Sequence, residues 1–124
     1  MRDYKHIKLD YLYLMAENDM NFAKDIIYSF KETIPLYFKD LESAIAEKSE
    51  ADVRFFAHKL SSSVQIVGAK ELSELARIIE NQAITRVDFE LLQEANSKLS
   101  NTFKEVVKEL NEELNHLHTS QISD

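Results

Sequence analysis

The stretch 53–68, VRFFAHKLSSSVQIVG, carries the strongest structural signal in the chain. Its apolar residues recur in steps of three or four, the pattern of a helix that buries one face. They are Val53, Phe56, Leu60, Val64 and Val67. At about 100° per residue these five fall within roughly 80° of one another, and His58 lies about 160° from their centre. The sequence therefore predicts a helix that buries one face and exposes a histidine on the other.

The residues around His58 define a candidate surface. Within about 60° of the histidine on the predicted helix lie Arg54, Phe55, Ser61, Ser62 and Gln65. Gly68, the only glycine of the chain, directly follows the apolar stripe. A glycine at this point is typical of a helix end, because the residue after a helix often needs a positive φ.

The same apolar spacing predicts a short helix from about residue 9 and three further long helices. The first long helix begins at a cap on Asp19, places Phe22 in the core and keeps its apolar register across Pro35. We interpret it as one helix with a bend at the proline, two helices end to end being the alternative. Ser49 is the expected cap of the His58 helix, and Asp88 that of the last helix.

A single glycine and a single proline among 124 residues argue against a strand-rich fold, which needs several such turns. Short connections make neighbouring helices antiparallel. We therefore expect an all-α fold, an up-down four-helix bundle with a short extra N-terminal helix. The chain fits one domain over residues 1–124, with a core of about 8–115, a frayed lead-in over 1–7 and a disordered tail over 118–124.

Composition excludes several classes of function. A net charge of −7 argues against nucleic-acid binding, which needs a basic face. The chain has no cysteine, so disulfides and thiolate metal sites are ruled out. No apolar run approaches 18 residues and no signal-peptide core follows Met1, so we expect a soluble, cytoplasmic protein that does not enter a membrane. The acidic side chains of Glu109, Glu112 and Glu113 are expected on solvated helix faces.

A family motif surrounds the histidine. Ala57-His58-x-Leu60 is followed by Gly68, ten positions after the histidine, and then by Leu72, Leu75 and the pair Ile79-Glu80. Residues upstream of the histidine match the same pattern more weakly; they are Asn18-Asp19, Phe22, Phe30, Pro35, Leu41 and Asp52. Over about residues 8–110 the chain thus resembles the histidine-containing phosphotransfer (HPt) domains of multistep two-component signalling. The resemblance implies that His58 receives a phosphoryl group from aspartates of receiver domains and passes it to them.

The motif departs from the family at two positions. Where the family usually has lysine and then glycine, three and four positions after the histidine, this chain has Ser61 and Ser62. In the family the lysine helps to hold the phosphoryl group and the glycine lets the partner approach. Arg54, one turn before His58, is the expected substitute for the cation. Lys59 lies about 100° round the helix from His58, so its side chain would have to reach back toward the histidine.

The resemblance also suggests supporting roles. Glu80 stands where the family carries an acidic or amide residue, and from there it is expected to hydrogen-bond His58 and fix which nitrogen attacks. Gln65 is a weaker candidate for a phosphoryl or partner contact, and Phe55, Ser61 and Ser62 are candidates for partner docking. Receiver domains and a hybrid histidine kinase are the expected partners, and Mg²⁺ is expected on the receiver, with no metal or cofactor held by this chain.

Two hypotheses of different class follow. The first is a monomeric phosphorelay carrier, not an enzyme, which is either free-standing or a module of a hybrid kinase. The second is a non-phosphorylated helical adaptor that binds receivers or kinases through the His58 face, favoured by the serines at 61 and 62. A metal-dependent bundle enzyme would need inward Glu-x-x-His pairs, and only Glu113 with His116 has that spacing.

Overall fold

The fold is described from a computed structural model of the chain, which covers residues 3–85 and 87–123, with side chains described as far as 118. The elements are α1 (Asp10–Met15), α2 (Met20–Ala46), α3 (Glu50–Ser63), the 3₁₀ turn η1 (Val64–Val67), α4 (Lys70–Thr85) and α5 (Phe89–Ser123). The residues described contain no strand, so the predicted all-α class is confirmed. None of these helices combines the length and the apolar character needed to cross a bilayer.

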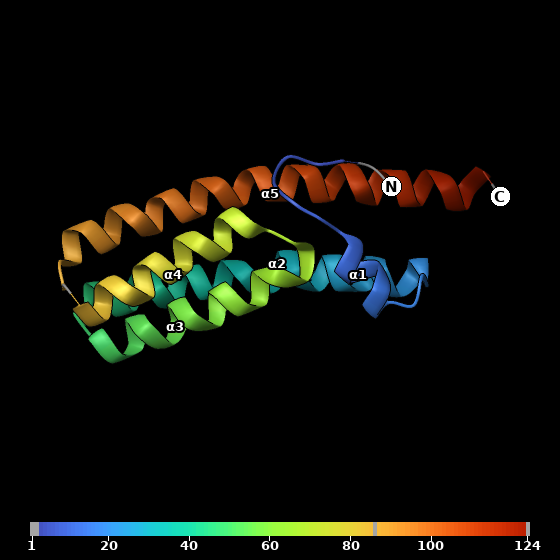
Figure 1. The fold of residues 1–124 in the computed structure, drawn as a ribbon. Helices are drawn as coiled ribbons and strands as arrows, with labels where there is room; N and C mark the ends of the chain where they lie inside the picture. The colour runs from blue at the N-terminus through green and yellow to red at the C-terminus, as the bar shows by residue number, and fades with distance from the viewer. Residues whose placement is uncertain (1–2, 86, 124) are drawn as a thin grey trace.

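The four long helices surround one core. Helix α2 packs against α3 and α5, and α4 packs against the same two helices. Figure 1 shows them side by side, with α5 continuing past the ends of α3 and α4 to the region covered by α1 and the N-terminal segment. The largest fully buried side chains come from α1 to α5 and include Leu12, Ile27, Leu60, Ile79 and Leu99. Burial of each such side chain is worth about 1.5–3 kcal/mol.

The predicted helix starts are confirmed. The Asp19 carboxylate accepts from the backbone N–H groups of Asn21 and Phe22 at 3.0 and 3.1 Å. The Ser49 hydroxyl accepts from the N–H of Asp52 at 3.4 Å, and Asp88 accepts from those of Glu90 and Leu91. These bonds satisfy N–H groups that the first helical turn leaves unpaired. Pro35 lies inside α2, so one continuous helix is correct.

Gly68 has two reasons to be glycine. Its φ is 63°, in the left-handed region, as the sequence predicts for a helix end. It ends the turn η1 rather than α3 itself, because the helix tightens into a 3₁₀ turn after Ser63. In addition, a Cβ at Gly68 would lie 2.3 Å from the backbone oxygen of Lys8. The second reason depends on the N-terminal segment, which packs directly against the glycine.

The N-terminal segment corrects the expectation of a frayed lead-in over 1–7, of which residues 1 and 2 lie outside the described part. The backbone N–H of His6 donates to Glu109 on α5 at 2.7 Å, and that of Lys8 donates to the Val67 carbonyl at 2.9 Å. Ile7 is only 5% exposed. Figure 1 shows this segment crossing α5 before it enters α1. It therefore belongs to the packed fold.

A buried carboxylate joins the N-terminal region to α5. Glu113 is 5% exposed and accepts hydrogen bonds from the hydroxyls of Tyr4 and Tyr13. The expectation of a solvated face is wrong for Glu113, and Glu109 is half-buried beneath the N-terminal segment. Burial of a carboxylate is tolerated where hydrogen bonds replace its lost hydration.

We expect Tyr13→Phe to lower the free energy of unfolding by about 1–2 kcal/mol, because it removes one of the two hydroxyl donors to a buried carboxylate. Tyr11→Phe is the matched control, since Tyr11 is exposed on the same helix. Urea titrations at pH 7 measure both. Equal stabilities for the two variants would show that the bond to Glu113 contributes nothing.

The same pair predicts a pH dependence. Burial, and then the hydrogen bond and charge of Glu113, raise the pKa of Tyr13 well above its usual value of 10.0. The folded chain therefore holds this proton more tightly than the unfolded chain does. The stabilisation of the folded state by protonated Tyr13 is complete below about pH 10 and is lost as the pH rises further. The free energy of unfolding should fall more steeply above pH 10 in the wild type than in Tyr13→Phe.

Two other details differ from the sequence prediction. Phe22 is 48% exposed, because the buried face of α2 follows Ala23, Ile27, Phe30 and Ile34 instead. Helix α5 continues to Ser123, through most of the segment 118–124 for which the sequence predicts a tail. Asp124 lies outside the described residues.

Candidate functional site

His58 stands on the exposed face of α3, as the apolar stripe predicts. Val53, Ala57 and Leu60 bury the opposite face against the core, while the His58 side chain is 70% exposed. The histidine lies in mid-helix, where the backbone is held by regular hydrogen bonds. A ring in this position is fixed at its base and open to solvent at its tip.

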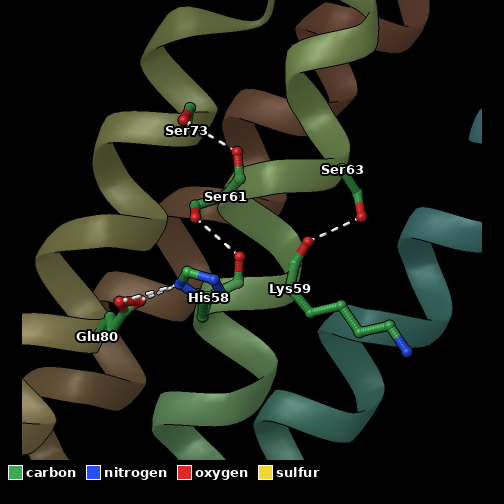
Figure 2. A network of polar contacts seen from close by, with 6 residues as sticks. All are labelled: His58, Lys59, Ser61, Ser63, Ser73 and Glu80. Atoms are coloured by element: carbon green, nitrogen blue, oxygen red, sulfur yellow. Dashed lines mark hydrogen bonds and ion pairs between the residues drawn. The ribbon is translucent and has the colours of Figure 1, made fainter.

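Glu80 meets the histidine from the neighbouring helix α4. Its two carboxylate oxygens lie 3.0 and 3.3 Å from Nδ1 of His58, and Figure 2 shows both side chains reaching across the gap between the helices. The Glu80 side chain is 23% exposed. Helix α4 thereby brings together the two residues that the sequence analysis paired.

This contact selects one form of the neutral imidazole. A carboxylate is only an acceptor, so the hydrogen bond requires a proton on Nδ1. The lone pair of the neutral ring then resides on Nε2, at the outer end of the side chain. The geometry thus prepares an exposed nitrogen nucleophile. The carboxylate also stabilises the positive charge that the ring acquires when Nε2 forms a bond.

We expect Glu80→Ala to change the tautomer of His58. Loss of a hydrogen bond to a charged group should move the Nδ1–H to Nε2–H ratio about tenfold toward Nε2–H. The ¹⁵N chemical shifts of the two ring nitrogens at high pH measure this ratio. Glu74→Ala, an exposed carboxylate on the same helix, is the control. An unchanged ratio in Glu80→Ala would show that Glu80 does not set the tautomer.

A surface hollow of about 620 Å³ surrounds the pair, between α3 and α4. Its lining contains Arg54, Phe55 and Ser62, three of the residues that the sequence places around His58. Phe55 is 57% exposed and its ring packs edge-on against Phe56. The hollow offers a histidine, an arginine and an exposed aromatic ring on one face.

Ser61 does not belong to this open surface. It is 4% exposed, and its hydroxyl donates to the His58 carbonyl at 2.8 Å. The expectation that Ser61 docks a partner is therefore wrong, since the side chain faces α4 and is already bonded. Ser62, the next residue, is exposed and stays a candidate for partner docking.

Two further candidates do not reach the histidine, although Lys59 also lines the His58 hollow. The ammonium group of Lys59 lies 5.2 Å from the centre of the Tyr37 ring and 5.7 Å from that of Phe55. Figure 2 shows this side chain directed toward α2, away from His58 and Glu80. Gln65 is exposed but lines a separate hollow with Ser73 and Arg77. Neither side chain contacts the histidine.

Ser73 and Ile84 on α4 also belong to the surroundings of the site, although no expectation was drawn for them from the sequence. The Ser73 hydroxyl donates to the Ser61 carbonyl at 3.0 Å (Figure 2), and Ile84 lines the His58 hollow. Ser73 and Glu80 are seven residues apart, which puts them on one helix face. That spacing is the sequence signal that marks the α4 side of the site.

The described part of the chain has no group of three or more His, Cys, Asp or Glu side chains placed to hold a metal ion. The geometry of the site is that of a nucleophile with an orienting carboxylate.

Comparison with known proteins adds one finding. No curated protein and no solved structure matches the chain. The family model described as the Hpt domain matches residues 25–120, a span that begins within α2 and includes His58, Glu80 and most of α5. Domains of this family transfer phosphoryl groups through histidine in two-component systems, where they interact with receiver domains and kinases. With the match extending over most of its length and an exposed histidine at the centre of the site, the chain belongs to the Hpt domain family.

Proposed function

We propose that the chain is a phosphorelay carrier that accepts and donates a phosphoryl group on Nε2 of His58. It exchanges the group with aspartates of receiver domains in a multistep two-component system. The observation that carries this proposal is the 3.0 Å contact between Nδ1 of His58 and Glu80, with the histidine 70% exposed. The four long helices that surround one core support the up-down bundle expected for such a carrier.

The transfer itself is a simple exchange of bonds. The Nε2 lone pair attacks the phosphorus of an aspartyl phosphate, the P–O bond to the aspartate breaks, and the free carboxylate leaves. The reverse reaction delivers the group to the next receiver. Because the transition state is loose and highly charged, catalysis depends on positioning and electrostatics. In our proposal the receiver brings Mg²⁺, while this chain supplies the oriented nucleophile, so it is a carrier rather than an enzyme.

The partner docks over the hollow between α3 and α4. Phe55 provides the exposed apolar contact and Ser62 permits close approach, since its side chain is small. Arg54, one turn before His58 and in the same hollow, is a candidate for holding the phosphoryl group. A hybrid histidine kinase and its receiver domain are the proposed source of phosphoryl groups, and the carrier acts as a cytoplasmic monomer.

The test mixes the protein with a ³²P-labelled receiver domain and Mg²⁺. We expect label that is stable in alkali and lost in acid, as for a phosphohistidine, and that passes on to a second receiver. The adaptor function, favoured by the serines at 61 and 62, predicts receiver binding without label. Binding of several receivers with no transfer from any of them would therefore reject the carrier and support the adaptor.

A further inference from the structure

The phosphorylated site needs a cation. A phosphoryl group carries between one and two negative charges at neutral pH, and on Nε2 it would lie close to the Glu80 carboxylate. Ser61 occupies the position at which the family usually has lysine, and its buried hydroxyl is bonded to the His58 carbonyl. The charge must come from another residue.

The contacts between α3 and α4 place Arg77 beside that position. His58 contacts Glu80, and Ser61, one turn further along α3, contacts Ser73, two turns earlier on α4. Arg77 lies four residues after Ser73 and three before Glu80, so it shares a helix face with both. In Figure 2 the part of α4 between Ser73 and Glu80 runs alongside α3 from Ser61 to His58. Arg77 is thus about 4.5 Å along the helix axis from Glu80.

The Arg77 side chain is exposed, and no described carboxylate lies within 4.0 Å of its guanidinium, whereas the adjacent Glu74 approaches Lys70 at 4.0 Å. Arg77 lines the hollow that contains Gln65 and Ser73, which is separate from the hollow around His58. The guanidinium is therefore free to turn toward a new anion.

We propose that Arg77 binds the phosphoryl group on His58 from α4 and so replaces the cation absent at position 61. The proposal rests on the proposed function. A guanidinium presents paired N–H donors that match two phosphoryl oxygens. Arg54 lies on the opposite side of His58 along α3, one turn toward the helix start. Arg77 comes from the side of Ser61, where the family's lysine would be.

The experiment uses phosphoramidate as a small phosphoryl donor, so that contacts with a receiver domain do not affect the measured rate of phosphorylation. Nε2 of His58 attacks phosphorus, the P–N bond of the donor breaks, and ammonia leaves. Label on His58 is followed by ³¹P NMR. We expect Arg77→Ala to slow phosphorylation about tenfold, the effect of losing one charge-assisted contact at an exposed site. Arg77→Lys, which keeps the charge but not the paired donors, should recover part of the rate, and Lys98→Ala, an exposed cation on α5, should leave it unchanged.

A second readout separates phosphoryl binding from a structural role. A nearby cation favours the dianionic phosphoryl group, so the ³¹P titration midpoint of phospho-His58 should rise in Arg77→Ala and return in Arg77→Lys. An unchanged rate and midpoint in Arg77→Ala would overturn the proposal, as would a loss seen only in Arg54→Ala. Absence of label on the wild type would reject the proposed function, and this inference with it.

Discussion

Replacing His58 with glutamine is expected to abolish phosphoryl acceptance from a phosphorylated receiver, a loss of at least several hundredfold that reaches the detection limit. Glutamine keeps a polar side chain of similar reach but has no nucleophilic lone pair on nitrogen. The side chain is 70% exposed, so the substitution removes no core packing and should leave the free energy of unfolding within about 0.5 kcal/mol of the wild type. Label transfer and urea unfolding, measured on the same preparation, test both statements.

His116→Gln is the matched control, because His116 is also an exposed helical histidine but lies far along α5 from the site. It should accept label at the wild-type rate. Label retained in His58→Gln would place the phosphorylated residue elsewhere and contradict the assignment. Label lost in both variants would point to a general effect on folding, which the urea titration would reveal.

The position of His58 could be predicted from the sequence because helical periodicity reports directly which face is buried. Val53, Leu60 and Val64 are fully buried, and the histidine opposite them is exposed. The caps at Asp19 and Ser49 could be predicted equally well, since a cap depends on a few neighbouring residues. Such features are local, and tertiary packing leaves them intact.

Features that depend on a neighbouring element were harder to predict. On the helical wheel Ser61 lies about 60° from His58, yet α4 covers it and leaves Ser62 exposed. Phe22 fits the apolar stripe of α2, but Ala23 and Ile27 face the core instead. In both cases spacing gives the approximate face, whereas the adjacent helix decides where the buried sector ends.

Polar residues buried far from their sequence neighbours could not be predicted. Glu113 lies among acidic residues that resemble a solvated surface, and only the fold brings the hydroxyls of Tyr4 and Tyr13 to it. The N-terminal segment was missed for the same reason, because its partners are Glu109 on α5 and Val67 on η1. No local pattern reports contacts across so much of the chain.

The largest expected effect on stability is that of Gly68→Ala, for which we predict a loss of about 3 kcal/mol or more. An alanine at a φ of 63° costs about 1–2 kcal/mol. The new Cβ would also lie 2.3 Å from the Lys8 oxygen and 2.8 Å from the Lys8 nitrogen. Relief requires movement of the N-terminal segment, including its bond to Val67 and the buried Ile7 beside it. Urea unfolding measures the loss, with Gln65→Ala, an exposed position in η1, as control.

Gly68→Asn separates the two causes. Asparagine tolerates the left-handed region better than alanine does, but it carries the same Cβ. If the contact with Lys8 dominates, as the 2.3 Å separation indicates, asparagine should be within about 1 kcal/mol of alanine. Recovery close to wild-type stability would instead mean that backbone conformation alone requires the glycine. The first result would also show that the N-terminal segment is held against η1 in solution, because only that packing forbids a side chain at Gly68.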